Sequence, residues 1–298
     1  MSKNIKSIIE VINYIENHLH EKLCLDIVAY AVHYSKYHLH RIFTNTVNLT
    51  VHNYIQRRRL TEAAKLLVFS DIPILKIALT FGYESQQSFT DAFKAMYKKS
   101  PKQYREEKKF YPLQLKYILN EHIAYLEKET NWNKKIIFAT NEDILDCIKL
   151  LHTVIDGFPH LNETQFIEQL QKYIKNGQVF ILKDVNIIIG IIAFHAITRN
   201  IDFLGIHPQY RKKGIEKAFF KKVYEFAHFD TITITTFRKG DKADTGYRKM
   251  LKNIGFVEAE LLYEFGYPTQ RLILHKKILE DTTNESDIHK RKSLSTKL

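Results

Sequence analysis

A short basic turn in the second half of the chain has the composition of an anion-binding site. Residues 204–216 read Leu-Gly-Ile-His-Pro-Gln-Tyr-Arg-Lys-Lys-Gly-Ile-Glu, which is an apolar strand end, a turn with Arg211 and Gly214, and a helix start. A glycine turn of this kind directs backbone N–H groups and the positive end of a helix toward an anion. The sequence therefore predicts that residues 211–214 hold a pyrophosphate.

A second chemical pattern is a repeated helix pair in the first third of the chain. Five residues recur 50 positions later: Leu25, Ile27, Ser35, Leu39 and Phe43 become Leu75, Ile77, Ser85, Phe89 and Phe93. In each copy a short apolar helix leads through a turn to a serine and a second helix, whose apolar residues lie four apart. This is the pattern of a helix-turn-helix, and its gapless duplication predicts a double DNA reader.

The second helix of each unit presents polar side chains that suit DNA recognition. The predicted DNA-binding residues are Ser35, Lys36, Tyr37, His40, Arg41, Ser85, Gln86 and Gln87. Arg41 lies opposite the apolar residues of its helix and is suited to donate two hydrogen bonds to guanine, as Gln86 or Gln87 is to adenine. Ser35 and Ser85 are expected to cap the helices and to hold phosphates.

Apolar periodicity indicates the elements that position these side chains. Residues 1–107 predict only helices, with one long helix over Val51–Phe69 that Thr50 caps. Its length of about 28 Å approaches the ~34 Å between successive major grooves, so one chain is expected to fill two grooves. The arginine run 57–59 is expected to combine a solvated face with contacts to the DNA backbone.

From residue 135 onward, strands and helices alternate. The expected strands are 135–140, 178–184, 187–197, 201–206, 231–237, 256–265 and 270–278, and the expected helices are 142–155, 162–176, 214–228 and 244–254. The predicted fold is therefore multi-domain: an all-α double helix-turn-helix domain, then a mixed α/β domain. The expected boundaries are 1–108 for the first domain, 109–134 for a linker, 135–279 for the second domain and 280–298 for a disordered tail.

The composition of the chain indicates what kind of partner it binds and in which cellular compartment it is expected. The formal net charge of +12 indicates an anionic partner or a Lys-rich genome composition, and the higher charge density of residues 1–110 favours the anionic partner. Cys24 and Cys147 lack partners at metal-ligand spacing, so reduced thiols and no metal site are expected. The longest apolar run, 187–194, is too short to cross a bilayer, and a cytoplasmic protein without membrane contact is expected.

The helix-turn-helix residues resemble the DNA-binding domain of the AraC/XylS family of bacterial transcription regulators. The resemblance covers residues 4–107 and depends on the segments 35–43, 59–67, 77–87 and Ser100-Pro101. It implies double-stranded promoter DNA as partner and the bacterial nucleoid as the place of action. Two residues depart from the family pattern: His33 stands where a glycine is common and is expected in a left-handed conformation, and Asp91 stands where a basic residue is common.

The second half resembles the GNAT superfamily of N-acetyltransferases over residues 135–278, through Arg211-Lys-Lys-Gly214 and Gly255-Phe256. The resemblance implies an α/β GNAT-like domain with a mixed, mostly antiparallel sheet, acetyl-CoA or another acyl-CoA as ligand, and no metal. The implied cofactor-binding residues are Leu204, Ile206, Arg211, Lys212, Lys213, Gly214 and Ile215. Glu216 stands where the family usually has Gly or Ala, and a carboxylate ~5 Å from a phosphate charge costs about 3 kcal/mol at an effective dielectric near 20.

Catalytic residues are less well matched. The family's tyrosine acid is replaced by Leu251, so Tyr247 or Tyr263 is left as a substitute, and Asp202 or His195 is a candidate base. Asp202 and Tyr263 are the catalytic candidates. Three hypotheses follow: a transcription regulator whose GNAT-like domain binds acyl-CoA or another small ligand, a bifunctional regulator and N-acetyltransferase acting on an amine, or a regulator with an inert or protein-docking second domain.

Overall fold

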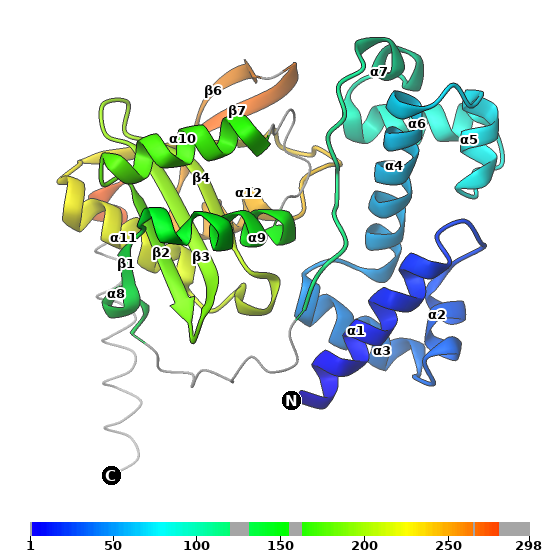
Figure 1. The fold of residues 1–298 in the computed structure, drawn as a ribbon, viewed down its shortest axis with the longest axis horizontal. Coiled ribbons are helices and arrows are strands. Elements are labelled where there is room, and N and C mark those ends of the chain that lie inside the picture. The colour runs from blue at the N-terminus through cyan, green and yellow to red at the C-terminus, as the bar shows by residue number, and fades with distance from the viewer. Residues whose placement is uncertain (1, 120–130, 155–162, 265, 280–298) are drawn as a thin grey trace.

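The structure, a computed structural model, describes residues 2–119, 131–154, 163–264 and 266–279. Figure 1 shows two parts side by side, a helical part formed by the first 107 residues and a part built on a sheet from residue 132 onward. The predicted fold class, an all-α domain followed by an α/β domain, is confirmed. The tail expected at residues 280–298 lies outside the described residues.

Hydroxyl caps begin several helices of the helical part. Its helices are α1 (Ser2–Asn17), α2 (Leu25–Ala31), α3 (Lys36–Val47), α4 (Val51–Phe69), α5 (Ile74–Thr80), α6 (Gln86–Tyr97) and α7 (Pro101–Glu107). Ser35, Thr50, Ser85 and Ser100 each accept a hydrogen bond from the backbone N–H three residues later. The prediction of one long helix over Val51–Phe69, capped by Thr50, is confirmed.

The two helix-turn-helix units match, but the prediction of a gapless repeat is wrong. Helices α3 and α6, the second helix of each unit and here called the reading helices, begin 50 residues apart. Helices α2 and α5, the first helix of each unit, begin 49 residues apart. The buried centres of these short helices are Val28 and Ala29 in α2 and Ile77 and Ala78 in α5. Left-handed His33 (φ 59°), as expected, therefore corresponds to Gly82 (φ 78°). The second turn holds one extra residue, so Ile27, which is exposed, has no counterpart in Ile77.

The arginines of α4 are structural, which corrects the expectation of a solvated, DNA-facing run. Arg57 and Arg58 are 2% and 7% exposed. Arg58 forms ion pairs with Glu16 at 2.8 Å and Glu62 at 2.9 Å. The Arg59 guanidinium donates to backbone carbonyls that follow α1. Each guanidinium donates to segments that lie far away in sequence. The sequence of residues 57–59 alone therefore does not indicate that these side chains are buried.

An extended segment, residues 109–119, runs between the two parts (Figure 1). It packs on α4 through Leu113 and the fully buried Gln114, whose backbone N–H groups both donate to the Thr61 hydroxyl at 3.1 Å. Tyr117 stacks on the buried Tyr54 ring. The first half of the expected linker is thus attached to the helical part, and residues 120–130 lie outside the described ones.

The sheet part contains one seven-stranded sheet among the described residues, in the order β1-β2-β3-β4-β5-β7-β6. Its strands are β1 (Ile136–Phe138), β2 (Val179–Asp184), β3 (Ile187–His195), β4 (Asn200–Ile206), β5 (Thr231–Phe237), β6 (Val257–Glu264) and β7 (Tyr267–His275). All neighbours pair antiparallel except β4 and β5, which are parallel. The mixed, mostly antiparallel sheet is as predicted.

Helices cover both faces of this sheet (Figure 1). The remaining elements are α8 (Trp132–Lys135), η1 (Asn141–Asp143), α9 (Ile144–Val154), α10 (Glu163–Lys175), η2 (Pro208–Tyr210), α11 (Ile215–Ala227) and α12 (Tyr247–Ile254). On one face, α9 and α10 pack on alternate residues of β2 and β3 such as Ile181 and Ile191. On the other face, α11 and α12 pack on the intervening residues, such as Leu182 and Ile192. Both faces are apolar, as the near-continuous apolar runs of these strands require.

The sheet opens in the middle. Parallel strands β4 and β5 pair only through Asn200 with Thr233 and Ile201 with Ile234. Beyond these pairs the last residues of each strand have no ladder partner on that side, so the strands diverge. The gap faces the basic turn that precedes α11, which places the predicted anion site at the opening.

Candidate functional sites

The structure places the predicted DNA-binding residues of α3 on one exposed face. Ser35 caps the helix, and Lys36, Tyr37, His40 and Arg41 are exposed, with Tyr37 80% accessible. Leu39, Ile42 and Phe43 lie on the other side in the core. The face stays accessible with the described residues of the sheet part in place.

In α6 the equivalent face carries a contact that the sequence did not reveal. Ser85 caps the helix in a reciprocal pair with Ser88, and Gln86 and Gln87 are exposed. The Gln87 side-chain amide donates to the Asp91 carboxylate at 3.0 Å, one helical turn further on. The Gln87 amide retains its second N–H and its carbonyl for a further partner. The acid that departs from the family pattern thus bonds to one of the predicted DNA-binding side chains.

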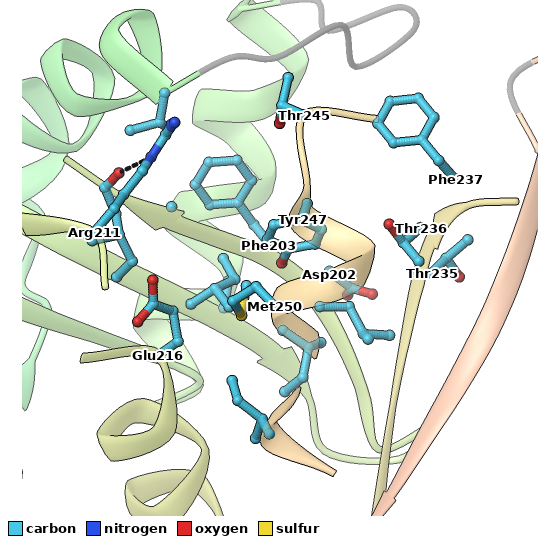
Figure 2. Close-up of a pocket in the computed structure, with 18 of the residues that line it drawn as sticks. Asp202, Phe203, Arg211, Glu216, Thr235, Thr236, Phe237, Thr245, Tyr247 and Met250 are labelled. Atoms are coloured by element: carbon cyan, nitrogen blue, oxygen red, sulfur yellow. Dashed lines mark hydrogen bonds between the residues drawn. The ribbon is translucent and has the colours of Figure 1, made fainter. Parts of the chain in front are cut away.

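A cavity of about 970 Å³ occupies the opening between β4 and β5. Its walls come from β4, β5, α12 and the turn before α11, and Figure 2 shows side chains from these elements facing the same space. The lining includes Phe203 and Leu204 on one side and Thr235 and Phe237 on the other. Its size and mainly apolar wall with a few polar groups are typical of a small-molecule site.

The basic turn at the mouth of this cavity has an open backbone. Gly214 begins α11 in a left-handed conformation (φ 77°), and a Cβ at this position would meet nothing within 4 Å. Lys212 is also left-handed, with φ 63°. These two left-handed residues, separated by Lys213, turn the chain into the helix, and the space beside Gly214 is open. This geometry suits an anion held by backbone N–H groups.

The structure separates the predicted cofactor residues into two groups. The residues that line the cavity are Leu204, Ile206, Arg211, Lys212 and Gly214. Lys213 and Ile215 are not part of that lining: the Lys213 ammonium lies 4.8 Å from the Tyr210 ring, and Ile215 is buried in the core. Desolvation lowers the pKa of Lys213.

Arg211 and Glu216 both line the cavity, and Figure 2 shows them on the same side of it. The Arg211 guanidinium donates to the Ile206 carbonyl and to the Tyr117 hydroxyl, both at 3.4 Å. Glu216 is 7% exposed, and burial raises its pKa while the Arg211 charge opposes the rise. A charged carboxylate is therefore unfavourable at this point even before an anionic ligand arrives.

Asp202 lies in the cavity, but other groups already bind its carboxylate. It accepts hydrogen bonds from the Tyr173 hydroxyl and from the Asn200 amide, the latter at 2.5 Å. Asn200 in turn accepts from the Thr233 hydroxyl at 2.9 Å. Burial and the Asp202 carboxylate raise the pKa of Tyr173 to about 12. This chain of hydrogen bonds holds the two parallel strands together at the point where they separate.

The structure does not bring Tyr263 or His195 to the cavity, so neither is placed for catalysis. Tyr263 is 70% exposed on the edge strand β6, and His195 accepts from the Thr198 backbone N–H at 3.2 Å. Leu251, at the position of the family's tyrosine, is fully buried in the core. Of the tyrosines weighed from the sequence, Tyr247 lines the cavity as the first residue of α12.

The described residues offer neither a metal site nor a membrane-spanning helix. They contain no group of three or more His, Cys, Asp or Glu side chains arranged to hold a metal ion. No helix among them has the length and apolar character that a membrane crossing demands.

Together, the exposed reading helices and the cavity of the split sheet define a two-domain protein, a helix-turn-helix DNA-binding domain followed by a GNAT domain. A family model described as a helix-turn-helix domain matches residues 28–107, and one described as an acetyltransferase (GNAT) domain matches residues 156–266. The chain belongs to the AraC-type transcription regulators.

Known relatives match the helical part. The transcriptional activator AarP of Providencia stuartii is 42% identical over 96 residues, which are 32% of this chain and 71% of that protein. The uncharacterized regulator YbfP of Bacillus subtilis is 38% identical over 124 residues, 42% of this chain. The chain spans 40% of the length of YbfP. A solved GNAT acetyltransferase from Bacillus cereus aligns with 47% of this chain and 96% of its own length, at 15% identity and a TM-score of 0.39.

Proposed function

We propose that this AraC-type regulator responds to a ligand: its helical domain reads promoter DNA, and its GNAT-like domain binds acetyl-CoA or another acyl-CoA that tunes the reading. The observation that carries the proposal is the cavity between β4 and β5, which ends at the open turn 211–214. In this proposal residues 1–108 read DNA in the bacterial nucleoid, residues 109–134 connect, and residues 135–279 bind the ligand.

The DNA-reading half of the proposal assigns base contacts to Tyr37, His40 and Arg41 in α3 and to Gln86 and Gln87 in α6. Their exposure in the whole chain supports this assignment. Ser35, Lys36 and Ser85 contact phosphates at the helix N-termini.

The ligand half of the proposal depends on how well the turn suits an acyl-CoA. Backbone N–H groups next to Gly214 would hold the diphosphate, and the diverging edges of β4 and β5 would take the pantetheine arm. When bound, acyl-CoA would supply a thioester within this cavity. Glu216 opposes the diphosphate and is expected to keep the affinity low, which suits a ligand that is sensed at high cellular concentration rather than held permanently.

Sensing is favoured over acetyl transfer by the residues that line the cavity. Leu251 is buried where a proton donor to a departing thiolate would be needed, and Asp202 is already bound by Tyr173 and Asn200. The bifunctional alternative assigns the acid to Tyr247, because the hydroxyls of Tyr173 and Tyr267, which also line the cavity, already donate to Asp202 and Asp241.

The test measures melting of the full chain with and without acetyl-CoA, together with thiol release in the presence of an amine mixture. Ligand at 100 times its Kd is expected to stabilise the chain by about 2.7 kcal/mol. Gly214→Trp should remove this stabilisation. Gly177→Trp is the matched control, because Gly177 has a similar φ of 65° and its nearest neighbour lies 3.9 Å away, outside the cavity.

Each outcome selects one hypothesis. Stabilisation without thiol release, together with a changed affinity for promoter DNA, supports the sensor. Steady thiol release that Gly214→Trp abolishes would replace the sensor by the bifunctional enzyme. No stabilisation by acetyl-CoA at millimolar concentration would leave the sheet domain as a docking module and would overturn the proposal.

A further inference from the structure

One loop of the sheet domain contacts both helix-turn-helix units at once. The loop between β5 and α12, residues 238–246, projects toward the helical domain (Figure 1). Ala243 is fully buried there, within the same apolar cluster as Leu60 and Ala64 of α4. The loop is therefore part of the core of the helical domain, although it belongs to the sheet domain in sequence.

The ends of the two reading helices bind this loop in equivalent ways. Asn48 ends α3 and Lys98 ends α6, both are left-handed with φ 61°, and they lie 50 residues apart in the repeat. The Asn48 side-chain amide donates to the Thr245 carbonyl at 3.5 Å. The Lys98 ammonium lies 2.9 Å from the Asp241 carboxylate, which is only 3% exposed.

A third contact comes from the helix that connects the two units. The Arg57 guanidinium of α4 donates to the Ala243 carbonyl at 2.9 Å and, through its other amino group, to the Leu113 carbonyl at 2.7 Å. Asp241 also accepts from the Ala243 backbone N–H at 2.9 Å, which keeps the loop in shape. Residues 241–245 thus receive one contact from each of α3, α4 and α6.

The same loop forms one wall of the cavity. Asn48, Phe237, Thr245 and Gly246 all line it, and Figure 2 shows Thr245 and Phe237 at its edge. A side chain at the end of a reading helix therefore lies in the wall of the ligand site. A ligand that displaces Thr245 or Phe237 acts directly on the contact between Thr245 and Asn48. It also acts on the contact to Lys98, because Asp241, the partner of Lys98, lies four residues before Thr245 in the same loop.

We propose that residues 241–245 form a clasp that holds the C-terminal ends of both reading helices, so that the state of the cavity sets the spacing at which the two helices reach DNA. The ligand-dependent part of this inference rests on the proposed function. The clasp itself rests only on the contacts to α3, α4 and α6. Because four residues span at most about 14 Å, the clasp limits how far the two helix ends can separate.

The clasp is tested by removing its side-chain anchors without disturbing the helix ends. The variant Asn48→Gly/Lys98→Gly deletes both anchors, and glycine tolerates the left-handed conformation better than either native residue. Lys108→Gly is the matched control, since Lys108 also ends a helix in a left-handed conformation (φ 51°) and is exposed. Asp241→Asn is a second variant that leaves the sequence of both reading units intact.

The assay uses a duplex selected from random sequence with the wild-type chain, and copies with one or two base pairs inserted between its half-sites. Each insertion moves one half-site by about 3.4 Å and rotates it by a tenth of a turn or so, so the wild-type chain and Lys108→Gly should lose about tenfold or more in affinity. The double-glycine variant should lose less than about threefold, and Asp241→Asn should fall between them.

Acetyl-CoA is then added to the same series. If the clasp transmits the state of the cavity, acetyl-CoA shifts the preferred spacing of the wild-type chain and not that of the double-glycine variant, although it raises the melting temperature of both. A double-glycine variant with the wild-type spacing profile in the absence of ligand would overturn the clasp. A wild-type chain that acetyl-CoA does not stabilise would overturn the proposed function instead, and the ligand-free comparison would still decide on the clasp.

Discussion

Acidification is expected to destabilise the sheet domain through His207, which begins the short helix η2 ahead of the basic turn. The imidazole is 6% exposed, accepts a hydrogen bond from the Gln209 backbone N–H at 3.3 Å and bonds to the backbone of Ile118. Burial, helped by the positive charge of Arg211, lowers the pKa of His207 from 6.5 to about 4. The side chain is therefore neutral in the folded protein at physiological pH.

The direction and size of the effect follow from the two pKa values of His207. The unfolded chain binds a proton at this residue near pH 6.5, and the folded chain binds it only near pH 4. The contribution of neutral His207 to the free energy of unfolding is thus fully present above the pKa of the unfolded chain, and it is lost as the pH falls from that pKa to the pKa of the folded chain. The complete loss is on the order of 3 kcal/mol, and most of it falls between about pH 7 and pH 4.5.

Urea unfolding of the wild-type chain and of His207→Asn, at constant ionic strength over this pH range, measures the loss. Asparagine keeps a side-chain acceptor for the Gln209 N–H but does not titrate. The single tryptophan, Trp132, donates to the Lys213 carbonyl at 2.8 Å, so its fluorescence follows unfolding beside the turn. The wild type should lose roughly 2 to 3 kcal/mol more than the variant on going to pH 4.5. Parallel curves for the two proteins would refute the role of His207.

Three further predictions use single substitutions. Arg41→Ala should cost about 1–3 kcal/mol on the selected duplex and far less on random DNA in a filter-binding assay, and equal losses on both would remove its role in base reading. Glu216→Gln should tighten acetyl-CoA binding by up to about 3 kcal/mol if a phosphate charge lies ~5 Å away, and calorimetry that finds no gain would place the diphosphate elsewhere. Arg58→Met leaves the largely buried Glu16 carboxylate without its cation and with the Tyr54 hydroxyl as hydrogen-bond donor, so urea unfolding should show a loss of about 3–5 kcal/mol. The exposed Arg41→Ala serves as its control and should stay within about 0.5 kcal/mol of wild type, whereas similar losses would mean that the Arg58 ion pairs contribute little.

Local signals in the sequence predicted the elements well. The helix over Val51–Phe69 has its predicted bounds because a hydroxyl cap and an apolar stripe are both readable within the segment itself. The exposed side chains of α3 were predictable for the same reason, since burial of Leu39 and Phe43 fixes which face points outward. The strand-turn-helix around Gly214 likewise carries its own signature.

Features that depend on distant segments were not predictable. Burial of Arg57 and Arg58 requires partners from α1, the extended segment and the loop before α12, and no local pattern reports them. Tyr263 was misplaced because β6 carries one extra residue between Glu258 and Leu261, and a single extra residue reverses which side chains face inward. The extra residue in the second helix-turn-helix turn escaped detection in a similar way, because the reading helices alone keep an offset of 50.

The contacts that join the two domains are of a kind that allows more than one arrangement. Arg57 donates to a backbone carbonyl, Asn48 donates to another, and Lys98 pairs with Asp241. Water can replace each of these polar partners, whereas Ala243 and Tyr267 of the sheet domain lie fully buried in the apolar cluster around α4. Removing one partner from a buried pair is costly, and exposing this apolar contact adds to the cost, so the docked arrangement is specific. Because the polar partners can be exchanged for water, a ligand that prefers a second arrangement of the two domains would shift the reading helices by as much as its difference in binding free energy allows.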